Sequence, residues 1–231
     1  MKGVKSSLLV AAIALTGKTI AQEATQAYTD ASTGITFSVW DPSPGNVRFG
    51  MAVPSDALTV DADEFIGLLT CSSATKAKGW CGMSFGGGMV ENLLLFAYPH
   101  GDSIQTSLRY ATDYTLPEVY TGNAKVMQIS ARVNETGYEL TFRCQGCLSW
   151  KQGPDGVEGG VKTTDGFLVL GWVHTSSQSP EEGNCADRAV VGQHETQGIF
   201  GGELNGEAVG LARYEEWVGQ ATGSENGGCA A

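Results

Sequence analysis

The residue types best suited to chemistry in this chain of 231 residues are a methionine that follows three glycines, three histidines and six cysteines. Gly86, Gly87 and Gly88 lack a Cβ atom, so the backbone there can turn sharply or let a flat group approach closely. The thioether of Met89 follows directly and can bind a soft or borderline metal ion. Most methionines pack in cores instead, so this segment alone favours a glycine-rich bulge with a buried methionine.

The three histidines do not form a recognisable metal-binding pattern. His100 lies between a proline and a glycine and is predicted to be an exposed turn residue. His174 ends an apolar stretch and is either a hydrogen-bonded histidine at a strand edge or a solvent-facing one. His194 lies in a polar stretch flanked by glycines. A hydrolytic zinc site usually needs three protein ligands, and no paired-histidine spacing is present, which argues against a zinc hydrolase.

The six cysteines predict three disulfides, since an even number in an exported chain usually forms a disulfide framework. Six cysteines permit 15 pairings. Short spacing favours two local pairs and leaves a third that would tie the C-terminal tail to a loop: Cys71–Cys81, Cys144–Cys147 and Cys185–Cys229.

The Cys144–Cys147 pair is a C-x-x-C sequence with several known uses. Covalent haem attachment would need a histidine next, but Leu148 follows, and a zinc ribbon would need a second such pair. A thioredoxin-like motif would need a βαβ context, so a structural disulfide is favoured. No G-x-S-x-G sequence supports a serine nucleophile. A glycoside hydrolase stays open, because acidic residues are plentiful although no pair is singled out.

The first 21 residues are predicted to be a secretory signal peptide, with a basic start, a short apolar core over 8–15 and cleavage after Ala21. No later run reaches the roughly 18 apolar residues of a spanning helix, so we expect a secreted, extracellular protein outside the membrane. The one glycosylation sequence, at Asn134, predicts an exposed turn.

The formal net charge of −11 argues against binding to nucleic acid or to anionic membranes. Removal of the signal peptide takes away three of the 14 basic residues and none of the 25 acidic ones, which brings the charge to about −14. This acidity fits either simple solubility or a partner with a basic patch.

The elements that must position these residues are short strands separated by Gly, Pro, Asp and Asn. A break is expected at 41–45, a helix over 207–219 and a short polar tail over 222–231. An all-β sandwich that forms one domain over 22–221, with a short C-terminal helix, is therefore predicted. The main strands are expected at 35–40, 47–53, 64–70, 79–85, 93–98, 104–110, 125–133, 138–144 and 167–173.

Four sequence blocks, in the same order, resemble the cytochrome domain of fungal cellobiose dehydrogenase. GGGMVENLLL at 86–95 resembles its G-G-x-M-x-x-x-L-L-L segment, and RYATDY at 109–114 resembles its R-W-A-T-G-Y. FRCQGCLSW at 142–150 is similar to its F-R-C-Q-G-C-x-x-W, which is quite specific. QHETQGIFG at 193–201 is similar to its E-H-T-x-F-G-x-F-G, with Glu195 in place of a threonine and Gln197 in place of an aromatic residue.

This resemblance implies an immunoglobulin-like antiparallel β-sandwich that binds haem b. The residues that match the axial ligands of the family are Met89 and His194. Tyr114 matches the tyrosine that hydrogen-bonds a haem propionate, and Tyr98 falls where the family has an aromatic residue, commonly tryptophan, beside the haem. The family disulfide falls on the Cys144–Cys147 pair.

The resemblance also implies a function in electron transfer rather than bond-making at iron. We expect a secreted, monomeric cytochrome that passes one electron at a time, resembling the cytochrome part of an oxidoreductase. Its expected donor is a separate extracellular flavin or quinone dehydrogenase, and its expected acceptors are copper lytic polysaccharide monooxygenases, with ferric reduction as a secondary activity. A haem-free carbohydrate-binding β-sandwich module is the alternative.

Overall fold

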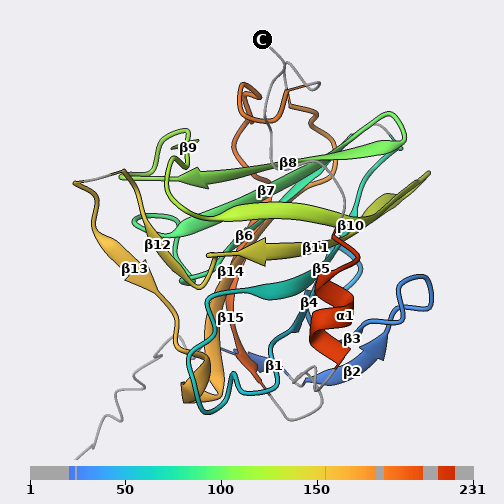
Figure 1. Cartoon of the computed structure of the whole chain (residues 1–231). Helices are drawn as coiled ribbons and strands as arrows, with labels where there is room; N and C mark the ends of the chain where they lie inside the picture. The colour runs from blue at the N-terminus through green and yellow to red at the C-terminus, as the bar shows by residue number, and fades with distance from the viewer. Residues whose placement is uncertain are drawn as a thin grey trace, which may run out of the picture.

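The computed structural model describes residues 21–23, 25–76, 78–153, 155–180, 185–204 and 213–221 (Figure 1). The predicted signal peptide up to residue 20 and the tail over 222–231 lie outside these residues. The elements are β1 (Ala21–Glu23), β2 (Gln26–Thr29), β3 (Thr36–Ser43), β4 (Val47–Ala52), β5 (Phe65–Ser72), β6 (Trp80–Ser84), β7 (Leu93–His100), β8 (Ser103–Tyr110), β9 (Glu118–Val119), β10 (Lys125–Asn134), β11 (Gly137–Gln145), β12 (Ser149–Lys151), β13 (Glu158–Gly160), the 3-10 turn η1 (Thr163–Asp165), β14 (Phe167–Thr175), β15 (Thr196–Glu203) and α1 (Tyr214–Val218).

Two large sheets form a sandwich, which confirms the predicted all-β class. One sheet has seven strands in the order β1-β15-β14-β6-β7-β8-β9, and the other has six in the order β10-β11-β5-β4-β3-β2. A two-stranded ribbon of β12 and β13 lies beside them. Neighbouring strands pair in antiparallel fashion, and β1 with β15 is the parallel pair among the described strands.

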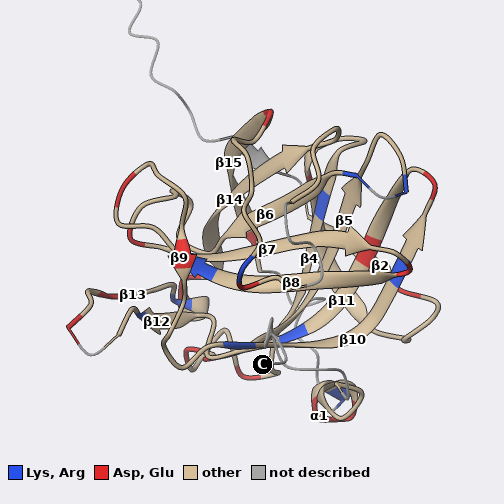
Figure 2. Ribbon diagram, turned by 90° about the horizontal axis from the view of Figure 1, so that it is seen from above, with Lys and Arg blue, Asp and Glu red and all other residues tan. Residues whose placement is uncertain are grey.

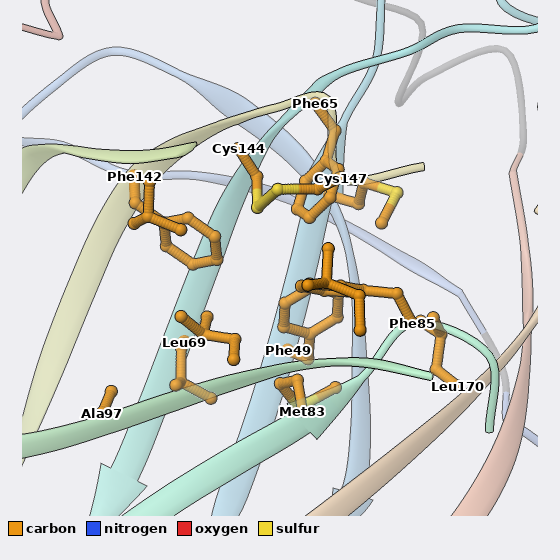
Figure 3. Close-up of a cluster of buried hydrophobic side chains, with 14 of the residues drawn as sticks. Phe49, Phe65, Leu69, Met83, Phe85, Ala97, Phe142, Cys144, Cys147 and Leu170 are labelled. Carbon is orange, nitrogen blue, oxygen red and sulfur yellow. A yellow bond between two sulfur atoms is a disulfide. The ribbon is translucent and has the colours of Figure 1, made fainter. Parts of the chain in front are cut away.

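The core lies between the two sheets because alternate residues of facing strands point inward. The ring centroid of Phe65 lies 5.3 Å from that of Phe85 and 6.0 Å from that of Phe142. Figure 3 shows this group beside Leu69 and Met83. Burial of each such aromatic side chain stabilises the folded state by about 1.5–3 kcal/mol. This packing holds the two sheets together and so fixes the positions of the residues on their outer faces.

A helix covers part of the outer face of the six-stranded sheet. Helix α1 buries Tyr214 and Trp217 on the outer face of the six-stranded sheet, against Phe37, Ile66 and Leu68 (Figure 1). Strand β5 is therefore apolar on both faces, which explains its nearly continuous apolar sequence. Charged residues lie mainly in loops and near strand ends (Figure 2). No helix among the described residues has the length and apolar character needed to cross a membrane.

Two of the three predicted disulfides are confirmed. Cys71–Cys81 joins β5 of one sheet to β6 of the other, and Cys144–Cys147 closes the end of β11. Cys185 is also disulfide-bonded, but Cys229, its expected partner, lies outside the described residues. The exposed turn predicted at Asn134 is present at the end of β10.

The predicted break at 41–45 is wrong in part. Strand β3 continues through Pro42 to Ser43, with an irregular register between Trp40 and Ser43. A bulge frees one residue from the ladder, so a proline that cannot donate a hydrogen bond is tolerated there. The predicted helix over 207–219 is confirmed only as α1, because 205–212 lies outside the described residues.

Candidate functional site

An aromatic cluster lies on the outer face of the seven-stranded sheet. Phe96 and Tyr98 of β7 point outward, because Leu95 and Ala97, which alternate with them along the strand, point into the core. The ring of Phe96 lies 5.0 Å from that of Trp80 on β6 and 5.3 Å from that of Tyr98. Ala186 and Ala189, from the segment after β14, pack over these rings and bury them.

His194 lies at the edge of this aromatic cluster. Its ring centroid is 6.5 Å from that of Trp80, with the two planes at 72°. Partial burial lowers the pKa of His194 below its ordinary value, which favours the neutral imidazole. Neutral imidazole is the form that binds metal ions, so the environment of His194 suits a ligand.

The residue after His194 fixes this part of the chain to the end of β14. The backbone N–H of Glu195 donates to the carbonyl of His174 (3.0 Å). Its carboxylate accepts hydrogen bonds from the hydroxyl of Ser177, and from the backbone N–H (3.1 Å) and hydroxyl (3.2 Å) of Ser176. These hydrogen bonds lower the pKa of Glu195 to about 2, so the carboxylate is ionised at neutral pH. The glutamate that replaces the family threonine therefore holds the histidine segment in place.

Arg109 of β8 holds the other part of the same segment. It is 7% exposed, and its guanidinium donates to backbone carbonyls of the segment that covers the aromatic cluster. The acceptors are the carbonyls of Ala186 (2.5 Å), Asp187 (3.1 Å), Ala189 (3.2 Å) and Pro117 (3.2 Å), and the hydroxyl of Ser107 (2.8 Å). The planar, five-donor guanidinium suits this converging set of oxygens.

Met89 lies in the loop between β6 and β7, where the glycines have a clear steric function. A Cβ at Gly171 of β14 would come within 2.1 Å of the Gly87 carbonyl, so the loop can rest on the sheet only where a side chain is missing. Gly87 also has φ of 86°, in the left-handed region that favours glycine. Met89 is half-buried. The glycines therefore bring the methionine loop close to the outer face of the sheet.

The two predicted ligands approach the same strand from opposite ends. His194 lies beside Trp80, the first residue of β6, whereas Met89 follows the loop that leaves from Ser84, its last residue. At about 3.3 Å per residue, these strand ends lie roughly 13 Å apart. The structure therefore places Met89 and His194 near opposite ends of one strand.

The donor set and its surroundings fit the haem that the resemblance implies. The hydroxyl of Tyr98 and the indole N–H of Trp80 are buried without a hydrogen-bond partner among the described residues. Such groups are costly and call for an explanation, for example a polar ligand that meets them. Burial raises the pKa of Tyr98 to about 12, so it stays a neutral hydrogen-bond donor. A thioether, an imidazole and an aromatic wall with two polar edges suit a haem.

The remaining predicted residues lie elsewhere. Tyr114 is 85% exposed in the segment after β8, and its contact with a propionate stays a prediction. His100 is exposed at the end of β7, as expected. His174 is buried, with Nε2 lying 3.0 Å from the carbonyl oxygen of Ser72, which makes it a hydrogen-bonded core histidine.

The sulfurs of Cys71 and Cys81 lie near the His174 ring, with all three atoms within 4.8 Å of one another. Metal binding at cysteine requires the thiolate, and these two sulfurs are joined in a disulfide. This buried group is therefore a structural one.

Sequence reasoning gave no role to Trp80 or to Arg109. Phe96 lies two residues from Tyr98, a spacing that places both side chains on one face of a strand. Nothing in the local sequence links Arg109 to 186–189, because 76 or more residues separate them and only the sheet order brings them together.

Comparison with known sequences shows that the chain is similar to a described family. The sequence profile described as the cytochrome domain of cellobiose dehydrogenase matches residues 28–216. A pyrroloquinoline quinone-dependent pyranose dehydrogenase of Coprinopsis cinerea is 34% identical over 177 residues, which are 77% of this chain and 23% of that protein. The chain thus spans about a quarter of the length of the curated relatives it matches.

Solved structures give the same result. The cytochrome domain of Myriococcum thermophilum cellobiose dehydrogenase superposes with a TM-score of 0.82 at 43% identity, covering 88% of this chain and 99% of that one. The cytochrome b domain of pyranose dehydrogenase from Coprinopsis cinerea has a TM-score of 0.69 at 29% identity, covering 86% and 96%. Both similarities extend over almost the whole of the solved domains.

Proposed function

The chain belongs to the family of the cytochrome domain of cellobiose dehydrogenase, and we propose that it is a secreted haem b cytochrome that transfers single electrons. The observation that carries the proposal is the position of His194 against the aromatic cluster. The buried polar edges of Trp80 and Tyr98 have no protein partner among the described residues there, and the Met89 loop approaches the other end of β6.

In this function, a bound haem b supplies a one-electron couple between ferric and ferrous iron. Met89 and His194 would hold the haem iron through a thioether sulfur and an imidazole nitrogen. A methionine and a histidine together would raise the reduction potential relative to two histidines. Trp80 would contact the imidazole of His194, Tyr98 would stand where the family has an aromatic residue near the haem, and Tyr114 would donate to a propionate.

A second part of the proposal concerns the partners. We propose that a flavin or quinone dehydrogenase donates the electrons, which is consistent with relatives named as cellobiose and pyranose dehydrogenases. Copper lytic polysaccharide monooxygenases would accept them, with ferric complexes as a secondary acceptor. The test is to mix the reduced protein with a copper monooxygenase or with a ferric complex and to follow haem reoxidation. Reoxidation no faster than by dissolved oxygen alone would remove that acceptor.

The cofactor is tested by adding haem b to the purified protein and recording absorption spectra. We expect a Soret band and the reduced α and β bands of a six-coordinate, low-spin haem. If no such bands develop, the protein is not a cytochrome, and a haem-free carbohydrate-binding sandwich becomes the better explanation.

The ligands are tested with matched variants. Met89→Ala should give a high-spin spectrum and a lower potential, whereas Met127→Ala, at another half-buried methionine, should leave both unchanged. His194→Ala should bind haem weakly, whereas His100→Ala should bind it like the wild type. An unchanged low-spin spectrum in Met89→Ala or unchanged haem affinity in His194→Ala would remove that residue from the ligand pair.

A further inference from the structure

The side chain of Asn92 reaches back under the loop that carries Met89. Its amide nitrogen donates to the carbonyl of Gly88 (3.1 Å) and to the carbonyl of Val90 (2.9 Å). These are the backbone carbonyls on either side of Met89. One side chain therefore fixes the backbone both before and after the methionine.

The same side chain explains why residue 86 is a glycine. A Cβ on Gly86 would lie 1.7 Å from the Oδ1 atom of Asn92, so the amide occupies the space that a larger residue would need. Gly86 makes room for Asn92, and Asn92 supplies the hydrogen bonds that a glycine-rich loop cannot provide for itself. The two residues act as a pair although six positions separate them.

Further contacts make the loop a defined structure. The hydroxyl of Ser84 donates to the carbonyl of Gly88 (2.5 Å), and the backbone N–H of Glu91 donates to the carbonyl of Ala111 (2.8 Å). Glu91 has φ of 59°, a left-handed conformation that is unfavourable for a residue with a Cβ. Such a conformation persists only where the surrounding contacts require it.

From this geometry we propose that Asn92 is the positioning residue for the methionine ligand, an inference that rests on the proposed haem function. A neutral thioether is a weak donor, so its hold on iron depends on how well the protein fixes it. Glycines 86–88 would let the backbone move if nothing restrained it. Asn92 supplies that restraint, in the way that groups behind a metal ligand orient it.

The experiment uses Asn92→Ala and Asn92→Asp in the haem-loaded protein. The aspartate keeps the size of the side chain but loses the N–H donors, so both variants should release the loop. We expect partial high-spin character and displacement of the methionine by added imidazole that is at least tenfold faster than in the wild type. Asn46→Ala, which removes an amide that donates to the Ser43 hydroxyl in another turn, should leave both properties unchanged.

A double-variant comparison separates positioning from general stability. In a Met89→Ala background, Asn92→Ala should no longer change the imidazole binding rate, because the ligand that it positions is gone. A folded Asn92 variant that exchanges imidazole within twofold of the wild-type rate overturns the inference, as does an effect that persists without Met89. If neither Asn92 variant folds, Ser84→Ala replaces them, with the same tenfold rise expected and the same twofold limit overturning the inference. A wild-type protein without a low-spin haem spectrum would instead refute the proposed function.

Discussion

Replacement of Arg109 by alanine tests how the segment that leads to His194 is held. The guanidinium is almost completely buried and donates to five oxygens, three of them on residues 186–189. Burial lowers the pKa of Arg109 below its ordinary value, yet an arginine stays charged at any working pH. The change therefore removes a charged group that serves several carbonyls at once.

The size of the effect follows from these contacts. Each hydrogen bond to a charged group contributes about 1.5–3 kcal/mol, but bonds that share one side chain are not additive. Freed carbonyls that reach water recover part of the loss, so we expect Arg109→Ala to lower the free energy of unfolding by about 3–5 kcal/mol. For a chain of this size that lowers the melting temperature by roughly 6–20 °C.

The assay combines urea unfolding with the rate at which bound haem is lost to an excess of a haem-binding protein. We expect lower stability and faster haem loss together, since the released segment covers Trp80 and leads to His194. Arg48→Ala is the matched control, because Arg48 forms a partly exposed pair with Asp41 that contributes about 1 kcal/mol at most. A loss below 1 kcal/mol in Arg109→Ala, with haem loss at the wild-type rate, would refute the reasoning.

Three further changes test the sandwich itself. The buried hydroxyl of Tyr138 on one sheet accepts a hydrogen bond from the backbone N–H of Cys81 and donates to the carbonyl of Ala97 on the other sheet. Tyr138→Phe should therefore lower the free energy of unfolding in urea by about 2–3 kcal/mol. The control Tyr28→Phe should change it by less than about 0.5 kcal/mol. Burial alone would raise the pKa of Asp30, but its hydrogen bonds lower the pKa to about 2. The ionised carboxylate therefore stabilises the fold by on the order of 2 kcal/mol above pH 4, and this stabilisation is lost between pH 4 and pH 2. Asp30→Asn should remove that part of the acid unfolding curve, and an unchanged curve would contradict it. Replacing both Cys71 and Cys81 by alanine removes a disulfide between residues ten positions apart. The free energy of unfolding, measured in the same way, should fall by about 2–3 kcal/mol. An unchanged value would mean that packing alone holds the two sheets together.

The strands that depend on their own apolar sequence were predictable. The run at 93–98 became β7, and the alternating run at 138–144 became β11, each within two residues at either end. Strand β15 was not predicted, because its sequence, TQGIFGGE, contains three glycines. The structure supplies the reason for this strand, since Trp172 lies over Gly198, Phe167 over Gly201 and Trp40 over Gly202. Aromatic side chains from elsewhere cover what the glycines leave open, and a local pattern cannot show that.

The choice between histidines shows the same limit. His174 lies in β14, and His194 lies two residues before Thr196 of β15, which pairs with His174. Sequence alone gave neither histidine an advantage before the resemblance was considered. The structure separates them physically, because the ring nitrogen of His174 lies within hydrogen-bonding distance of Ser72 inside the sandwich. The ring of His194 meets Trp80 on the outer face. Register within the sheet, rather than distance along the chain, decides which histidine is available to a ligand.

The two candidate ligands share one structural principle, which is that each stands on a loop restrained by polar side chains at the end of a strand. Asn92 and Ser84 hold the methionine loop, while Arg109 and Glu195 hold the histidine segment. None of these four belongs to the apolar core between the sheets. Changes at Asn92 should therefore alter ligand geometry with little effect on the sandwich, whereas changes at Tyr138 should do the opposite. If the Asn92 variants and Tyr138→Phe changed haem ligation and global stability in parallel, the separation of the methionine loop from the core would be wrong.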